Sequence, residues 1–154
     1  MIYQDSYGTI REIKKYGCYM CSIINAYLAQ KAKQLHVVDV NELYYKALDD
    51  QIINRNCFIN SALAFCVKVL RWDVKDVRKE TADYVPKNNE VEILLMRRYA
   101  PTLPDAEKDG YVYHFVLKSK HGTIYDPIQK GAVTTTNGDI QTKRIFVLNE
   151  VSIV

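Results

Sequence analysis

The sequence contains few of the residues that cross-link a chain or interrupt its regular structure. Among 154 residues there are four cysteines, four prolines and six glycines, which excludes a disulfide scaffold and a low-complexity chain. Long hydrophobic runs are also missing, because none approaches the roughly 18 residues of a membrane span. The amino-terminal stretch MIYQDSYGTIREIKK lacks the basic start and apolar run of a secretory signal. We therefore expect a cytoplasmic protein with reduced cysteines and no membrane partner.

A strong charge of one sign is absent as well. Lysine and arginine number 21 against 18 acidic residues, and the net charge of +3 falls short of the basic surface of a nucleic-acid-binding domain. The sequence has no GxxxxGK[ST] loop and no GxGxxG, so no nucleotide cofactor is expected. A structural zinc site needs four ligands, and Cys57 and Cys66 have no Cys or His pair at a matching spacing. We therefore expect no nucleic-acid partner, no metal and no cofactor.

The sequence does have enough apolar material for one core. Hydrophobic residues make up 48%, which at this length predicts a single domain over residues 1–154. Helical periodicity precedes Val85-Pro86, and short β-rich runs follow it. We expect a helical half over about 10–80 and a β half over about 88–154, an arrangement of the α+β class. The sequence leaves the oligomeric state open.

One segment of the helical half contains no charge. From Tyr16 to Gln30 every residue is uncharged, and Met20, Ile24 and Leu28 recur at helical spacing. Such a segment predicts a helix that is buried on most sides. A second helix is predicted to start at Asp39, which begins a D-x-x-E capping box ahead of an apolar run.

The last predicted helix and the strands follow from turn and capping signals. A third helix falls near residues 60–70, with Asn60 or Ser61 as its N-cap. Turn signals lie between Pro101 and Gly110, at His121-Gly122 and at Asn137-Gly138. They separate four β-rich runs, which are VEILLMRRY (91–99), YVYHFVL (111–117), GTIYDPI (122–128) and RIFVLN (144–149).

Cys18 occupies a position that favours reactivity. It follows Gly17 and begins the uncharged helix. The first turn of a helix carries unpaired backbone N–H groups and the positive end of the helix dipole, and both stabilise a thiolate. The same N–H groups can hold the oxyanion that develops during acyl transfer. Cys18 is therefore the candidate nucleophile.

A nucleophilic thiol also needs a base and a group that orients the base. Of the three histidines, His36 follows the first helix and His121 lies at a turn. His114 instead lies within a strand, on the side that carries Val116, where an unpaired imidazole would be out of place. Asp126 precedes a proline on the next run. Considered alone, His114 could be a core histidine with its hydrogen bonds satisfied, and Asp126 could simply start a turn. Considered together, they are candidates for the base and its orienting group.

In their order along the chain, GCYMCSIINA, YHFVL and YDPI resemble the papain-like cysteine peptidases, and most closely the C39-like branch that includes bacteriocin-processing transporter peptidase domains. The resemblance implies a buried N-terminal helix that carries the cysteine and packs on a C-terminal antiparallel sheet. It implies Cys18 as nucleophile, His114 as general base and then acid, and Asp126 as the group that orients the imidazole. The resemblance also implies a peptide or protein substrate, although related triads also serve amide hydrolases and acyl transferases.

The sequence departs from that family at the oxyanion hole. These peptidases usually carry a glutamine several residues before the nucleophile, whereas here the nearest upstream one is Gln4. Tyr19 and Met20 also follow Cys18, where the family usually has small residues. Loss of one oxyanion donor costs on the order of 100-fold to 1000-fold in rate. Three possibilities stay open: the Cys18 N–H serves alone, another side chain replaces the glutamine, or the chain is a catalytically silent module that binds peptides.

A redox role is a further alternative, because Cys18 and Cys21 form a C-x-x-C pair. Thioredoxin-like pairs follow a strand within a βαβ pattern. Here the preceding IREIKKYG alternates poorly, and the later chain is not βαβ. Cys21 is explained more simply as a small buried residue on the apolar side of the helix.

The proposed triad makes a geometric prediction. A three-residue loop from Lys120 to Gly122, with its glycine in the left-handed conformation, pairs Ser119 with Thr123. In that register His114 and Asp126 project from the same face of the sheet, within reach of a hydrogen bond. We expect the buried helix on the same face, with its first turn beside His114. One ring nitrogen should then face the cysteine and the other should face Asp126.

Overall fold

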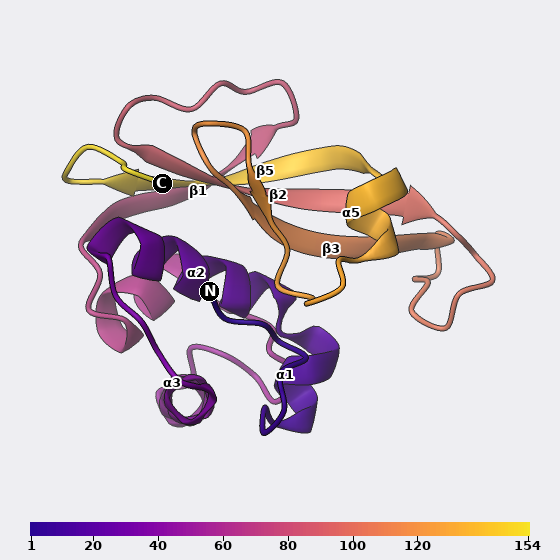
Figure 1. Ribbon diagram of the computed structural model, residues 1–154, viewed down its shortest axis with the longest axis horizontal. Coiled ribbons are helices and arrows are strands. Elements are labelled where there is room, and N and C mark those ends of the chain that lie inside the picture. Colours follow the sequence, from indigo (N-terminus) through magenta and orange to yellow (C-terminus); the bar gives the residue numbers. More distant parts are fainter.

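The computed structural model describes all 154 residues, except for the side chain of Val133. Five strands form one antiparallel sheet in the order β1-β5-β2-β3-β4, and most of the helices precede them in the chain (Figure 1). The chain is therefore an α+β protein. The strands are β1 (Val74–Thr81), β2 (Glu90–Tyr99), β3 (Tyr111–Lys118), β4 (Ile124–Tyr125) and β5 (Asp139–Leu148).

The helices gather mainly on one side of the sheet, where α2 and α3 lie (Figure 1). A π-helical turn, Phe65–Val69, continues α4 directly. Ser61 is one of the two residues predicted as the N-cap of this helix. Its side chain caps α4 by accepting a hydrogen bond from the Ala64 N–H at 3.1 Å. The helices are α1 (Arg11–Tyr16), α2 (Cys18–Lys31), α3 (Val37–Asp49), α4 (Ala62–Ala64) and α5 (Val133–Asn137).

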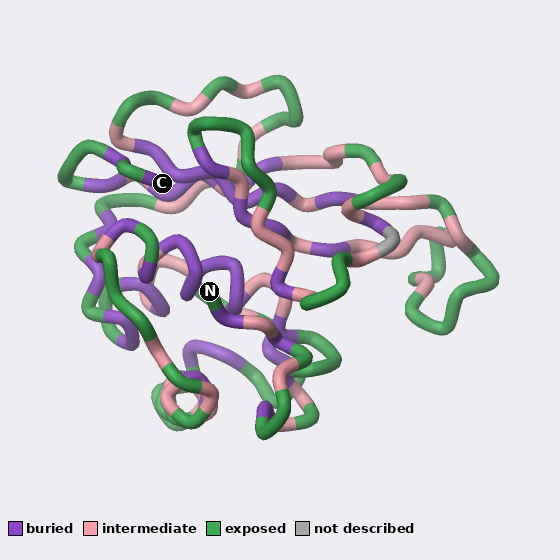
Figure 2. The backbone as a smooth tube through the Cα atoms, in the orientation of Figure 1, coloured by how far each residue is buried: buried purple, intermediate pink, exposed green. Residues whose placement is uncertain are grey.

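Helix α2 is the predicted buried helix. Met20, Ile24 and Leu28 are all buried, and Figure 2 shows burial along nearly the whole helix. Its polar residues are satisfied: the Asn25 side chain accepts from the Ile2 N–H at 2.6 Å and donates to the Ile2 carbonyl at 2.9 Å. This pair fixes the amino-terminal segment alongside α2, where Figure 1 shows it.

The structure differs from the sequence prediction at several element boundaries. The predicted helical half extended to about residue 80, but β1 already begins at Val74. This strand is charged and lies at the sheet edge, where charged side chains replace the apolar alternation of an inner strand. Helix α3 begins at Val37, because Asp39 accepts from the His36 N–H at 2.7 Å and is the third helical residue, not the cap. The short helices α1 and α5 were not predicted.

The hairpin between β3 and β4 has the predicted register. Leu117 pairs with Tyr125, and the Ser119 N–H donates to the Thr123 carbonyl at 2.9 Å. Gly122 has a φ of +88°, the left-handed conformation that this loop requires. β4 is shorter than predicted, and Asp126 lies immediately after its last residue. The hairpin therefore brings Asp126 opposite the part of β3 that carries His114.

One expectation about the sheet faces is wrong. The body of α2 packs on the face that carries Phe115 and Leu117, where the main core lies. His114 alternates onto the other face, with Val116 and its neighbours on β2. The helix was expected on the His114 face because its first turn had to lie beside His114. Cys18 nevertheless reaches His114 at the outer edge of β3, as described below.

Candidate active site

Helix α2 presents Cys18 at its first residue. Gly17 links α1 to α2, and its N–H donates to the Ile13 carbonyl at 2.8 Å. A Cβ at Gly17 would lie 2.5 Å from that same carbonyl oxygen, so the two helices can join so closely only through glycine. Its φ of −82° is ordinary, so the requirement is steric and not a special turn. Cys18 is half-buried at this junction.

His114 and Asp126 are hydrogen bonded. The imidazole Nε2 lies 2.7 Å from Asp126 Oδ1, and the two side chains are only 6% and 12% exposed. The strand side of the site therefore has the predicted pairing of one ring nitrogen with the carboxylate. The second ring nitrogen, Nδ1, is therefore available to the Cys18 thiol.

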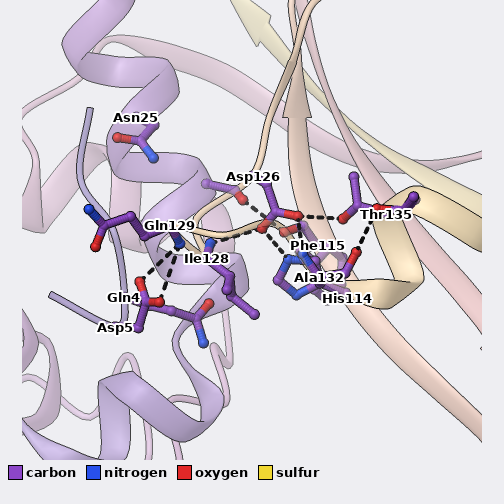
Figure 3. A network of polar contacts seen from close by, with 12 residues as sticks. Gln4, Asp5, Asn25, His114, Phe115, Asp126, Ile128, Gln129, Ala132 and Thr135 are labelled. Carbon is purple, nitrogen blue, oxygen red and sulfur yellow. Dashed lines mark hydrogen bonds and ion pairs between the residues drawn. The ribbon is translucent and has the colours of Figure 1, made fainter.

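Four groups fix the Asp126 carboxylate (Figure 3). In addition to His114, it accepts from the Ile128 N–H at 2.8 Å, the Ala132 N–H at 2.9 Å and the Thr135 hydroxyl at 2.5 Å. Burial raises the pKa of Asp126, but these hydrogen bonds and the charge of His114 outweigh it and hold the pKa well below its ordinary value. Asp126 is therefore an oriented anion that can only accept hydrogen bonds.

The Cys18 thiol is the second neighbour of the imidazole. Burial lowers the pKa of His114, but the hydrogen bonds with Asp126 and then with Cys18, together with their charges, raise it to about 9. The imidazole between the thiol and the carboxylate is consequently protonated at neutral pH. The structure brings together all three candidate residues of the sequence.

An open strand edge explains how Cys18 reaches a side chain of the opposite sheet face. β4 pairs only with Leu117 and Lys118, so among the described residues no strand pairs with the outer side of β3 at His114. One residue along each element, the Tyr19 ring stacks on Phe115 with centroids 4.3 Å apart. This stack places the start of α2 at the strand edge, where the Cys18 and His114 side chains meet.

Gln4 is a site residue that sequence reasoning considered too distant. Its backbone N–H donates to the Pro127 carbonyl at 2.8 Å, and its side-chain Nε2 donates to the Lys14 carbonyl at 2.9 Å. The side chain is buried and lines the same cleft as Cys18 and His114, while its Oε1 has no hydrogen-bond partner among the described residues. Helix α1 accounts for the long sequence separation, because it folds back between Gln4 and α2.

The site opens into a cleft of about 1100 Å³. One wall is the segment from Asn56 to Leu63, and another is the loop from Leu103 to Glu107, within the loop that sequence analysis placed before the histidine strand. Figure 3 shows the segment after Asp126 passing Gln4 and Asp5, with Gln129 donating to the Asp5 carboxylate at 3.1 Å.

The other three cysteines are enclosed. Cys21, Cys57 and Cys66 are buried, and burial raises the pKa of each of their thiols, that of Cys57 to about 12. Cys21 lies one helical turn after Cys18 but has no exposed surface, so it is poorly placed to exchange disulfides with a partner. Within the described part of the chain, no three metal-binding side chains cluster as a metal site.

The comparisons with known proteins place the chain in a family. The model of a family described as protein of unknown function, DUF261, matches residues 1–148, so the chain belongs to that family. No curated protein matches the chain, and no solved structure matches it. Among the residues described, no helix is both long enough and apolar enough to cross a membrane.

Proposed function

We propose that the chain is a papain-like cysteine peptidase, or a related thiol amide hydrolase or acyl transferase, of the C39-like kind. The observation that carries the proposal is the imidazole of His114, which lies between an oriented carboxylate and a thiol at the start of a buried helix. This arrangement faces a cleft rather than solvent or core. A nucleophile, a base and an orienting group in contact are the minimum for covalent acyl transfer.

The proposed reaction uses each group at a defined step. His114 first takes the proton of the Cys18 thiol, so the sulfur attacks the carbonyl carbon as a thiolate and forms a C–S bond; the resulting imidazolium then gives its Nδ1 proton to the leaving amine as the C–N bond breaks. Water then adds to the thioester, His114 takes the proton from that water, and the acid leaves as Cys18 is regenerated. Asp126 stays ionised and holds Nε2 throughout.

Gln4 and the Cys18 backbone N–H are the proposed oxyanion donors. The first N–H groups of a helix have no acceptor within the helix and point at a negative charge placed there. The Gln4 Nε2 uses one hydrogen on the Lys14 carbonyl and has a second for the oxyanion. This placement supports an active enzyme over the silent peptide-binding module, which was favoured only by the absence of a glutamine shortly before Cys18.

Acetyl transfer from p-nitrophenyl acetate tests the proposal without knowledge of the natural substrate. We expect a burst of one p-nitrophenolate per chain, with the acetyl group found on Cys18 by peptide mapping. Cys18→Ala should abolish the burst, whereas the matched variant Cys66→Ala should keep it. An unacetylated wild-type protein would contradict the proposal, and a Cys18–Cys21 disulfide formed under mild oxidation would support the redox alternative.

A further inference from the structure

The cleft contains a half-buried arginine that the proposed chemistry does not use. Arg144 on β5 lines the cleft together with Cys18, and its guanidinium carbon lies 5.7 Å from the centre of the Phe115 ring. Phe115 is also the ring on which Tyr19 stacks. The Phe115 ring therefore connects Arg144 to Tyr19, the residue that follows Cys18. The guanidinium is held over a ring face, which orients it and removes part of its water.

Arg144 has no carboxylate partner among the described residues. One of its terminal nitrogens donates to the Thr142 hydroxyl at 3.0 Å and approaches the Lys143 carbonyl at 3.5 Å. Neighbouring cations of the sheet are paired instead: Arg78 lies 2.6 Å from Glu90, and Lys143 lies 2.8 Å from Glu92. Arg144 therefore retains most of its planar set of donors for a group that enters the cleft.

A second cation stands beside it. Lys79 on β1 is the cross-strand partner of Arg144, is exposed, and also lines the cleft. The carboxylates that line the cleft, Asp105 and Glu107, are exposed on the loop between β2 and β3 and form no ion pair with either cation in the described part of the chain. The positive charges of Arg144 and Lys79 are thus not neutralised by a carboxylate among the described residues.

We propose that Arg144, assisted by Lys79, binds a carboxylate of a peptide that lies in the cleft, and so selects acidic substrates. This inference rests on the proposed function, because it names the substrate class of the same site. Arginine matches a carboxylate through two parallel N–H donors, and Lys79 adds a point charge. The carboxylate is either an aspartate or glutamate side chain or the free carboxyl terminus of the peptide, and both present the same chemistry to Arg144.

The test measures peptide binding without catalysis. Cys18→Ala protein is immobilised and offered two libraries of random N-acetylated hexapeptides, one with free carboxyl termini and one with amides. We expect the retained peptides to be enriched in aspartate or glutamate at one position if a side chain is bound, or to come mainly from the free-acid library if the terminus is bound. Adding Arg144→Gln should weaken binding of these peptides by about 10-fold to 100-fold.

Two further variants keep the result interpretable. Cys18→Ala with Arg98→Gln removes the same charge from a half-buried β2 position outside the cleft, and it should keep the acidic preference. Arg144→Lys, which keeps the charge without the planar donors, should give an intermediate loss. Retention without acidic preference, or a preference that survives Arg144→Gln, overturns the inference and leaves the acetyl-transfer result untouched. Failure to retain any peptide also overturns it, while acetylation of Cys18 still reports on the proposed enzyme.

Discussion

Two buried clusters of charged side chains lie on this sheet, and they differ in what their charges face. In the first, Glu92 lies between Lys118 at 3.0 Å and Lys143 at 2.8 Å, and Lys143 also donates to the Tyr84 carbonyl at 2.7 Å. In the second, His114 lies between Asp126 and Cys18. Only the second cluster lines the cleft.

The difference separates a charge cluster that is compensated within the fold from the one that the proposed function uses. Each carboxylate oxygen of Glu92 pairs with an ammonium group, so the negative charge of this cluster is compensated within the fold. In the His114 cluster, Asp126 accepts four hydrogen bonds from the protein, whereas Cys18 lines the cleft. Its thiol is half-buried, and its imidazole has a pKa raised to about 9. Variants of the two clusters should therefore affect different properties.

The largest expected effect is on stability, from Glu92→Gln. This change leaves Lys143, whose side chain is 7% exposed, without its opposite charge. We expect the free energy of unfolding in urea to fall by about 3–5 kcal/mol. Lys118→Met, at a side chain 32% exposed, should cost less than about 1 kcal/mol. Alkylation of Cys18 should not change in either variant, and a slower alkylation would break the proposed separation of the clusters.

Gln4→Glu should separate oxyanion stabilisation from thiol reactivity. The variant keeps the size of the side chain and removes its N–H donors, so acetyl transfer from p-nitrophenyl acetate should slow by on the order of 100-fold. Iodoacetamide reacts without an oxyanion, so its rate with Cys18 should change less than about threefold. Equal losses in both reactions would mean that Gln4 supports the local structure and not the oxyanion.

The pH dependence of stability should report the charged imidazole. The folded-state pKa of His114 is about 9, above the ordinary 6.5 of the unfolded chain. Its stabilisation is therefore complete below about pH 6.5 and is lost as the pH rises to about 9. We expect the stability advantage of the wild type over His114→Gln to shrink by on the order of 2 kcal/mol across this range in urea unfolding. An advantage that stays constant with pH would show that His114 is neutral in the fold.

The smallest expected effect comes from the outer partner of the carboxylate. Thr135→Val removes one of the four donors to Asp126, so we expect a stability loss of about 1 kcal/mol and a fall of less than about fivefold in Cys18 alkylation. Thr136→Val is the matched control, because its exposed hydroxyl bonds only the Ala132 carbonyl at 3.4 Å. Equal effects of the two variants would show that the Thr135 hydroxyl does not support Asp126.

Patterns within short segments of the sequence predicted the helix and the hairpin of the site, because both depend mainly on neighbouring residues. The uncharged run predicted α2, and the loop that ends at Gly122 predicted the register that brings Asp126 opposite β3. The side of the sheet covered by α2 was not predictable, because it depends on β3 having an open edge at His114. Gln4 was missed because its position depends on long-range contacts, namely the Asn25 side chain on Ile2 and the Gln4 N–H on Pro127.

The charged strand β1 shows a second limit of sequence patterns. Its residues Val74–Thr81 carry charges on both faces and show no strand alternation, so they were included in the helical half that was expected to extend to about residue 80. Pairing with β5 decides its structure, and no single-sequence pattern encodes that partner. Edge position, cross-strand partner and sheet face all depend on the whole fold.

The pH profile of Cys18 alkylation by limiting iodoacetamide, mapped by mass spectrometry in the wild type and in His114→Gln, tests the proposed pairing of thiol and imidazole. We expect Cys18 alone to be labelled in the wild type at pH 6, and His114→Gln to slow this labelling by about 100-fold, to the rate of an ordinary thiol. The two proteins should converge near pH 9, where the imidazole loses its charge. Superimposable profiles, or equal labelling of Cys18 and Cys21, would contradict an imidazole-activated thiol at this site.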